Sequence, residues 1–295
     1  MKKVVFTGAG VAIVTPMHAD GTVNYEKLGE VIDFQIDNGT DCIVICGTTG
    51  ESATLDNDEH IKVITYAVER TNHRVPVVAG AGSNDTAYAV SLCKEAKAVG
   101  VDALLSVTPY YNKTSQAGLI RHFNTIADAT DLPVILYNVP SRTGTCISPN
   151  TYLELSKHPN IVATKEASGN ISDIAKTRAL CGDNLNMYSG DDNQIVPIMA
   201  LGGLGVISVL SNILPRQTHD ICQLWLDGKT KESADMQLKY LALMNDMFID
   251  VNPIPVKEAM NIMGMDVGPC RLPLVELSAE AKAHLTATLK NYKLI

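Results

Sequence analysis

The chain of 295 residues has no run of basic residues and no long apolar run, and its formal net charge is −8. Without a basic patch, a surface that binds nucleic acid or anionic membranes is not expected. No apolar stretch approaches the roughly 18 residues that a membrane span needs. We therefore expect a protein without nucleic-acid or membrane partners.

The amino-terminal segment lacks the pattern of a cleaved signal peptide. Two lysines precede an apolar stretch at 4–14, but Gly8 and Gly10 interrupt that stretch. No small-residue cleavage site follows at once. We expect this segment to be the first strand of a cytoplasmic protein.

The cysteines lack the spacing of a metal site. There are seven, an odd number, scattered at positions 42, 46, 93, 146, 181, 222 and 270. Cys42 and Cys46 are four residues apart, which would place both on one face of a strand. Metal sites usually combine a tighter pair with a second pair. We therefore expect no metal site, and buried reduced thiols as in cytosolic proteins.

The sequence does contain a series of apolar, β-branched runs separated by amphipathic stretches. These runs predict strands at 11–16, 42–48, 75–81, 103–109, 134–139, 161–166, 187–190 and 205–210. They are continuously apolar rather than alternating, which is typical of strands buried on both faces in a parallel sheet.

The stretches between the strands have helical periodicity. The segment 24–38 has apolar residues at helical spacing and stops at Gly39, and helices are likewise expected at 56–70 and 84–99. Eight strand–helix units predict an α/β fold, a closed (β/α)8 TIM barrel. An open doubly wound sheet is the alternative, although no Gly-rich loop follows the first strand as that fold requires.

No further strand is expected after position 215. Helices are predicted at 216–226, 233–249, 256–263 and 279–292, with a proline break at 252–255. This pattern predicts a catalytic barrel at 1–226 and a C-terminal helical region at 227–295. That region would cover one flank of the barrel or supply contacts between subunits.

Lys165 lies in the apolar run 161–168, where burial of an ammonium group is costly. The same penalty lowers the pKa of the amine and frees its lone pair. A desolvated lysine can therefore attack a carbonyl and form a Schiff base. The alternative is a lysine at a strand end that reaches water or pairs with a carboxylate.

Polar residues collect at the predicted C-terminal ends of the strands, where the active site of such a barrel lies. They are Thr48 and Thr49, Tyr110 and Tyr111, Tyr137, Arg142, Lys165, Gly190, Asp191 and Asp192. Each has a plain structural interpretation as a turn, a packing aromatic or a solvated charge. Their joint placement on one rim favours a function.

These groups suit an imine-forming aldolase that acts on a keto acid. Thr48 and Thr49 offer hydroxyl and backbone N–H groups to a carboxylate. Tyr137 could transfer protons while the carbinolamine forms and collapses. Arg142 could hold a second carboxylate. Such an enzyme requires no metal, because the lysine replaces the metal as electron sink.

Over essentially its whole length the chain resembles the dihydrodipicolinate synthase family, in the pyruvate-dependent class I aldolase superfamily that includes N-acetylneuraminate lyase. The matching motifs are GVAIVTPM (10–17), GTTGESATL (47–55), VTPYYNK (107–113), LYNVPSRTG (136–144), KEASGN (165–170), SGDD (189–192), GVISV (205–209) and NPIPVKEAM (252–260). The motif at 136–144 separates this family from the lyases, which usually lack an arginine at the Arg142 position.

The resemblance implies a role for each matching residue. Lys165 would form the imine with pyruvate; Thr48, Tyr137 and Tyr111 would relay protons, with Tyr111 entering from a neighbouring subunit; Thr49 would bind the pyruvate carboxylate; Arg142 would bind the carboxylate of aspartate semialdehyde; Gly190 and Ile207 would line the pyruvate pocket.

The activity that the resemblance implies is a lyase-type condensation of pyruvate with L-aspartate 4-semialdehyde. The product would be 4-hydroxy-tetrahydrodipicolinate, a step toward diaminopimelate and lysine, and no cofactor is implied. Members of the family are commonly homotetramers built as dimers of dimers.

Two other functions stay open. A sister aldolase, such as a sialic acid or keto-deoxy-sugar lyase, is one, although Arg142 suits a short carboxylated aldehyde better than a neutral polyol. A non-catalytic keto-acid-binding barrel is the other, although it should lack Lys165 or the relay tyrosine Tyr137.

In lysine-sensitive relatives an allosteric pocket lies at the dimer interface. The matching positions here include Ser52, Ala53, Asn57, His60, Asn84, Tyr88 and Tyr110. Asn57 stands where those relatives usually have histidine, and Tyr88 stands where they have glutamate. Because a tyrosine brings no negative charge to a ligand ammonium, we expect inhibition by lysine to be weak or absent.

Overall fold

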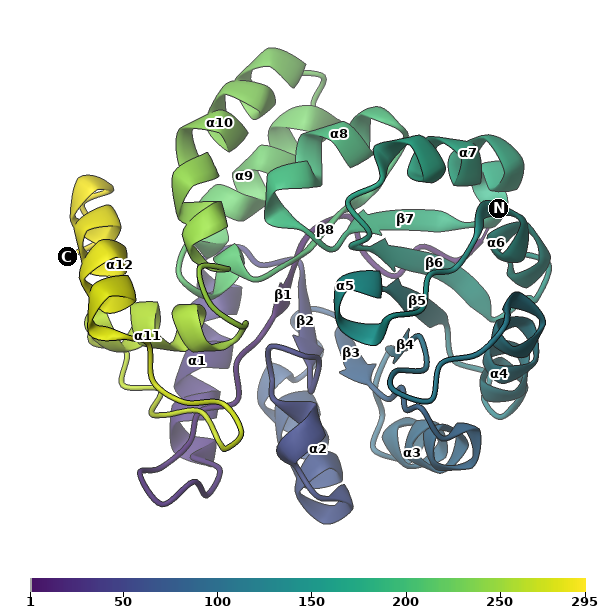
Figure 1. Cartoon of the computed structure of the whole chain (residues 1–295), viewed down its shortest axis with the longest axis horizontal. Coiled ribbons are helices and arrows are strands. Elements are labelled where there is room, and N and C mark those ends of the chain that lie inside the picture. The colour runs from purple at the N-terminus through teal and green to yellow at the C-terminus, as the bar shows by residue number, and fades with distance from the viewer. Residues whose placement is uncertain (1) are drawn as a thin grey trace.

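The computed structural model describes residues 2–295, which form a closed barrel of eight parallel strands surrounded by helices (Figure 1). The strands are β1 (Gly8–Ala12), β2 (Cys42–Ile45), β3 (Val77–Gly80), β4 (Ala103–Val107), β5 (Val134–Asn138), β6 (Ile161–Glu166), β7 (Asn186–Ser189) and β8 (Gly205–Ser208). They follow one another around the barrel in chain order, and β1 closes it by pairing with β8. The predicted TIM barrel is therefore confirmed, and the open sheet is excluded.

The helices that follow the strands surround the barrel, except that the four-residue helix Pro140–Thr143 lies at its C-terminal mouth. They are α1 (Tyr25–Asp37), α2 (Asn57–Thr71), α3 (Thr86–Ala98), α4 (Gln116–Asp128), α5 (Pro140–Thr143), α6 (Pro149–Leu155), α7 (Ile171–Cys181), α8 (Ile195–Ala200) and α9 (Pro215–Leu226). The first three begin at Asn24, Asp56 and Asp85, whose side chains accept backbone N–H groups of the first turn. Such caps satisfy donors that the helix itself leaves unpaired.

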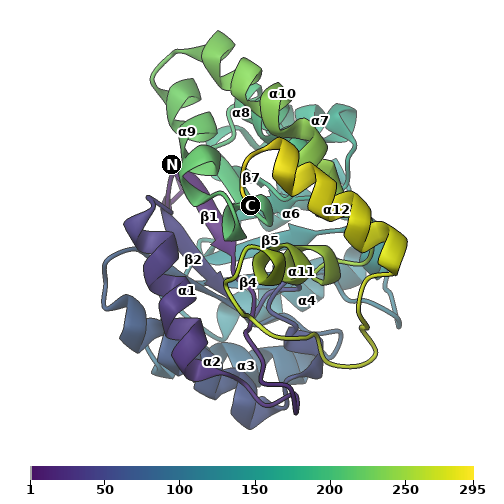
Figure 2. The same cartoon turned by 90° about the vertical axis from the view of Figure 1, so that its left-hand side faces the viewer.

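The C-terminal helices lie on one side of the barrel, beside α1 and α9 (Figures 1 and 2). They are α10 (Thr230–Asp246), α11 (Ile254–Ile262) and α12 (Ala279–Asn291). The helix α10 packs on α9, and α12 packs on α10 and α11. The division of the chain at 226/227 stays a prediction.

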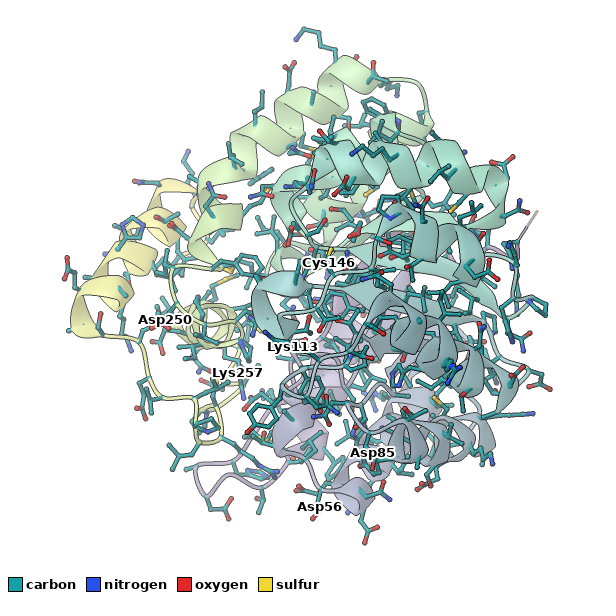
Figure 3. All side chains as sticks on the ribbon, turned by 45° about the vertical axis from the view of Figure 1, so that its right-hand side comes forward. Asp56, Asp85, Lys113, Cys146, Asp250 and Lys257 are labelled. Atoms are coloured by element: carbon teal, nitrogen blue, oxygen red, sulfur yellow. The ribbon has the colours of Figure 1, made fainter. Side chains whose placement is uncertain are left out.

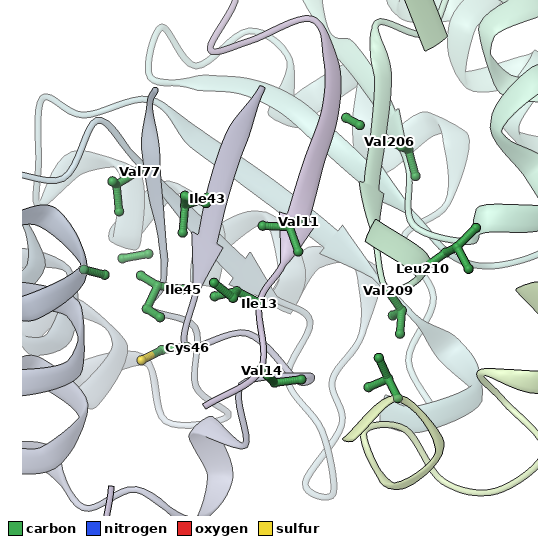
Figure 4. Packing of buried hydrophobic residues seen from close by; sticks show 14 of the residues in the cluster. Val11, Ile13, Val14, Ile43, Ile45, Cys46, Val77, Val206, Val209 and Leu210 are labelled. Atoms are coloured by element: carbon green, nitrogen blue, oxygen red, sulfur yellow. The ribbon is translucent and has the colours of Figure 1, made fainter. Parts of the chain in front are cut away.

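Two large apolar clusters stabilise the barrel, beside a small one formed by Ile174, Met187 and Ile198. One joins the outward faces of the strands to the helices and includes Val11, Ile43, Val77 and Val206 (Figure 4). The other fills the interior with residues such as Phe6, Ala12, Val44, Tyr137, Tyr188 and Ile207. Strands buried on both faces are expected to be continuously apolar, and this is the pattern in the sequence.

The first strand was predicted at 11–16 and lies at Gly8–Ala12, so this prediction is wrong by three to four residues at each end. Gly10 lies inside the observed strand, before the predicted start. A Cβ at Gly10 would stand 2.8 Å from Cζ of Phe6, so the glycine makes room for the Phe6 ring inside the barrel. Beyond Ala12, the backbone N–H of Val14 donates to Oδ1 of Asn212 at 3.1 Å instead of to a strand.

The other predicted strands and helices differ from the observed ones by three residues at most at either end. One detail of β2 is wrong. Cys42 and Cys46 do not share a face, because the strand ends at Ile45 and Cys46 has a φ of 53°. Cys42 belongs to the interior cluster and Cys46 to the outer one.

All seven cysteines are free thiols, and the two that are not fully buried are Cys146 and Cys270. Within residues 2–295, none of the helices combines the length and the apolar character that crossing a bilayer requires.

Candidate active site

Lys165 and Tyr137 lie side by side on neighbouring strands inside the C-terminal mouth of the barrel. They are register partners across β5 and β6. The Lys165 side chain is 5% exposed, and its Nζ stands 4.3 Å from the centroid of the Tyr137 ring. Both side chains are therefore held in a space from which most water is excluded.

Burial lowers the pKa of Lys165 to about 8 from the usual 10.5. The negative charges of Asp191 and Asp192 oppose this shift, and the positive charge of Arg142 adds to it. Desolvation is the largest of these effects, because the amine is almost completely removed from water. A substantial fraction of the amine is therefore neutral near physiological pH.

Burial also raises the pKa of Tyr137 to about 12, although Arg142 and the Thr48 hydroxyl pull it in the opposite direction. The phenol consequently stays protonated beside the amine. A neutral hydroxyl that can both donate and accept is suited to pass a proton between Lys165 and a reacting oxygen.

Two acidic residues after β7 set the charge around the amine. Asp191 is partly buried, and desolvation raises its pKa to about 6. Oδ2 of Asp192 accepts the backbone N–H groups of Val209 and Leu210 at 3.1 and 2.9 Å, which fixes the end of β8 against β7. The SGDD motif had marked both residues, but no role had been predicted for either.

Thr49 and Arg142 are joined through one residue of the C-terminal region, Asn252. Nδ2 of Asn252 donates to Oγ1 of Thr49 at 3.0 Å. Nη2 of Arg142 donates to the backbone oxygen of Asn252 at 3.1 Å. The two groups expected to bind carboxylates are thus held in a fixed relation. No role was predicted for Asn252, although the motif at 252–260 contains it.

A buried ion pair fixes the loop that carries Thr48 and Thr49. Nζ of Lys257, on α11 (Figure 3), lies 2.8 Å from Oε1 of Glu51, and neither side chain is more than 2% exposed. Lys257 also donates to the backbone oxygens of Thr15 and Pro269. Oε2 of Glu51 accepts the N–H of Arg271 at 2.8 Å. Sequence reasoning missed this pair, because its members are 206 positions apart.

Gly190 follows β7 directly and Ile207 lies within β8, and their role in lining a pyruvate pocket stays a prediction. The N–H of Gly190 donates to the Glu166 oxygen at 2.7 Å, and a Cβ there would stand 2.8 Å from Cβ of Ala167. Glycine therefore fits this position without displacing Ala167, which a larger residue would not. Ile207 is fully buried in the interior cluster that also contains Tyr137.

Tyr111 is the one predicted catalytic residue that this chain does not bring to its own mouth. Its side chain is 92% exposed, and its φ of 68° lies in the left-handed region. A non-glycine residue in that region carries strain of about 1–3 kcal/mol. The ring is therefore exposed on this chain, as a residue that enters the site of a neighbouring subunit would be.

A cavity of about 440 Å³ opens beside the mouth and reaches from Thr48 and Arg142 to the predicted allosteric positions. Ser52, Ala53, His60, Tyr88 and Tyr110 all line it. Asn57 and Asn84 do not line it but bond to residues that do: the Tyr88 hydroxyl donates to Asn57 at 3.3 Å, and Asn84 donates to the Tyr110 oxygen at 3.1 Å. The only acidic lining residue is Glu51, which Lys257 neutralises.

In the part of the chain that the structure describes, no cluster of three or more His, Cys, Asp or Glu side chains has the arrangement of a metal site. The mouth presents the amine of Lys165, the hydroxyls of Tyr137 and Thr48 and the guanidinium of Arg142. Together they can form an imine with a carbonyl compound and bind carboxylates beside it.

Known proteins resemble this chain along its whole length. The sequence model of the Dihydrodipicolinate synthetase family matches residues 5–292. The 4-hydroxy-tetrahydrodipicolinate synthase of Lachnoclostridium phytofermentans is 59% identical over 292 residues, which is 99% of each chain. The crystal structure of dihydrodipicolinate synthase from Aquifex aeolicus superposes with a TM-score of 0.96 at 45% identity and covers 98% of this chain and 99% of that one. The chloride-inhibited enzyme from Acinetobacter baumannii, solved with pyruvate, gives a TM-score of 0.97 at 40% identity and covers 99% of this chain and 100% of its own.

Proposed function

This chain belongs to the dihydrodipicolinate synthetase family, and on that premise we propose that it is a 4-hydroxy-tetrahydrodipicolinate synthase. It condenses pyruvate with L-aspartate 4-semialdehyde through a Schiff base on Lys165, in the route to diaminopimelate and lysine. The observation that carries the proposal is the buried Lys165 amine, whose pKa is lowered to about 8, beside the Tyr137 hydroxyl.

The reaction begins when the neutral amine of Lys165 attacks the keto carbon of pyruvate. The carbinolamine loses water and leaves the imine. Tyr137 and Thr48 carry the protons for these steps, together with Tyr111 of the partner subunit. Loss of a methyl proton then converts the imine into an enamine, because the protonated imine nitrogen accepts the electron pair.

The enamine carbon attacks the aldehyde carbon of the semialdehyde and forms the new carbon–carbon bond. The amino group of the semialdehyde next attacks the imine carbon and displaces Lys165. This transimination closes the ring and regenerates the free amine. Thr49 holds the pyruvate carboxylate, Arg142 holds the carboxylate of the semialdehyde, and Gly190 and Ile207 shape the pocket around pyruvate.

Substrate choice and the Arg142→Ala variant test the proposal. We expect the enzyme to consume pyruvate with aspartate semialdehyde and not with a neutral sugar aldehyde. Loss of a charge-assisted contact, worth about 1.5–3 kcal/mol, should lower kcat/KM for the semialdehyde by about 10- to 150-fold while trapping of pyruvate stays nearly unchanged. Preference for the sugar aldehyde would identify a sister aldolase, and equal loss for both substrates would give Arg142 a structural role.

We propose that the chains assemble into a dimer of dimers. Each chain holds its own Tyr111 out to solvent, and in such an assembly that residue enters the mouth of a neighbouring chain. The proposed compartment is the cytoplasm. All seven cysteines are free thiols, and reducing compartments preserve thiols.

A further inference from the structure

Asn252 lies between α10 and α11, outside the barrel strands, yet it contacts both carboxylate-binding groups of the mouth. Its side chain donates to the Thr49 hydroxyl, and its backbone oxygen accepts from Arg142. The residue is 5% exposed. Its Oδ1 is buried without a hydrogen-bond partner in the described chain. A buried amide that leaves one of its polar atoms unpaired contributes little to stability, which favours a role other than folding.

The direction of the Asn252–Thr49 hydrogen bond matters for chemistry. A threonine hydroxyl has one proton and can accept through its lone pairs. Because Nδ2 can only donate, the Thr49 oxygen accepts, and its proton is left free to point toward a ligand. A carboxylate accepts such protons and cannot donate any. The amide thus prepares Thr49 to donate to an anion.

The frame around Asn252 keeps this contact in place. The loop after Thr49 is tied to α11 by Glu51 and Lys257, five positions after Asn252. The Thr15 hydroxyl donates to the Gly50 oxygen at 2.7 Å, and Lys257 donates to the Thr15 backbone oxygen at 3.1 Å. Thr49 and Asn252 therefore belong to two segments that cannot move independently.

We propose that Asn252 is a positioning residue that orients the Thr49 hydroxyl toward the pyruvate carboxylate and sets its distance from Arg142. The inference rests on the proposed function. It makes the C-terminal region a part of the pyruvate site. Asn252 acts on pyruvate through the contact of its side chain with Thr49, and on the semialdehyde through the contact of its backbone oxygen with Arg142. Substitution of the side chain removes only the first contact and so separates the two effects.

The test introduces Asn252→Leu, which removes the Nδ2 donor but keeps the side-chain shape. The substitution is made once in the chain that retains Thr49 and once in a chain that carries Thr49→Val. The readout is the pyruvate concentration that gives half-maximal reductive trapping. With Thr49 present, we expect Asn252→Leu to raise this concentration by about 3- to 10-fold, the range for one neutral hydrogen bond. In the Thr49→Val chain the same change should have less than about a twofold effect, because no hydroxyl remains to be oriented. KM for the semialdehyde should stay within about twofold, since the backbone oxygen is retained.

Asn252→Ala provides a second variant in case leucine disturbs packing, and thermal melting shows that each variant is folded. If wild-type protein traps pyruvate but half-saturation is unchanged in both folded Asn252 variants, the inference is overturned and the proposed function stands. The inference is also overturned if Asn252→Leu raises the half-saturating pyruvate concentration equally with and without the Thr49 hydroxyl, because Asn252 then does not act through that hydroxyl. If wild-type protein traps no pyruvate, both the proposed function and the inference are wrong.

Discussion

At the scale of single residues, the reactivity of Lys165 results from two opposing physical effects. Burial disfavours the ammonium, and the charges of Asp191 and Asp192 favour it. Oδ2 of Asp192 accepts two backbone N–H groups, and burial raises the pKa of the Asp192 carboxyl. The carboxylates therefore hold the lysine less strongly than an ion pair would, and the amine remains a usable nucleophile.

The rate of imine formation should report this pKa. With a pKa of about 8, about a tenth of the amine is neutral at pH 7, whereas an ordinary lysine would be neutral at well under a thousandth. We expect the single-turnover rate with pyruvate, measured by rapid quenching into borohydride, to rise about tenfold per pH unit below pH 8 and to level off above it. Asp191, whose pKa is raised to about 6, should add only a weak inflection. A rate that still rises steeply through pH 9 would mean that the amine is not desolvated in this way.

The residues that sequence alone could identify are those whose type conflicts with their surroundings. Lys165 was predicted because a lysine in an apolar strand is costly, and Tyr137 because it stands at the end of the preceding strand. Asn252 and Lys257 gave no such signal, because asparagine before proline suits a loop and lysine suits a helix surface. Their functions arise from contacts with Thr49 and Glu51, which are more than 200 positions away.

At the scale of elements, the contact between the loop after β2 and α11 is held by a buried ion pair, Glu51–Lys257. Removing one partner of such a pair leaves an uncompensated buried charge. We expect Lys257→Met to lower the free energy of unfolding by about 3–5 kcal/mol, measured by urea denaturation at fixed protein concentration.

Lys231→Met is the matched control, because Lys231 pairs with Asp235 on the exposed face of α10. Exposed pairs of this kind contribute little, so its urea midpoint should not change measurably. Equal midpoints for Lys257→Met and Lys231→Met would show that the buried pair does not stabilise the fold.

Most elements could be predicted because apolar runs and helical periodicity are local signals. The strand β6 lies where the sequence placed it. The strand β1 lies three to four residues nearer the amino terminus than predicted. Gly10 belongs to it and makes room for the Phe6 ring inside the barrel, a contact that no local pattern reveals. The strand β2 ends three residues earlier than predicted. The positive φ of Cys46 turns the chain there into the loop that carries Thr48 and Thr49.

At the scale of the whole molecule, the exposed Tyr111 predicts that an active site is shared between chains. We expect Tyr111→Phe and Lys165→Ala chains, each poorly active alone, to regain activity when mixed. In a hybrid dimer, the Lys165 of one chain would meet an intact Tyr111 from the other. Activity should be followed after native mass spectrometry has shown that hybrids form. Hybrids without any regained activity would place Tyr111 in the site of its own chain.

Regulation by lysine should be weak or absent. Five of the seven predicted allosteric positions line one cavity, where Glu51 is the only acidic residue among the described lining residues, and Lys257 already neutralises it. Tyr88 and Asn57 supply neutral groups, and the carboxylate behind them, Glu95, accepts from Asn57 at 3.1 Å. A ligand ammonium that loses a charged partner binds about 1.5–3 kcal/mol more weakly. Half-inhibition of the initial rate at submillimolar lysine would contradict this expectation.

Trapping of pyruvate on the protein tests the Schiff base most directly. Pyruvate is added, the mixture is reduced with borohydride, and intact mass is measured before peptide mapping. Condensation with loss of water followed by reduction should add about 72 Da to each chain, located on Lys165, and the Lys165→Ala variant should gain nothing. An unchanged wild-type mass, or an equal gain in the Lys165→Ala variant, would contradict the assignment of Lys165 as the nucleophile.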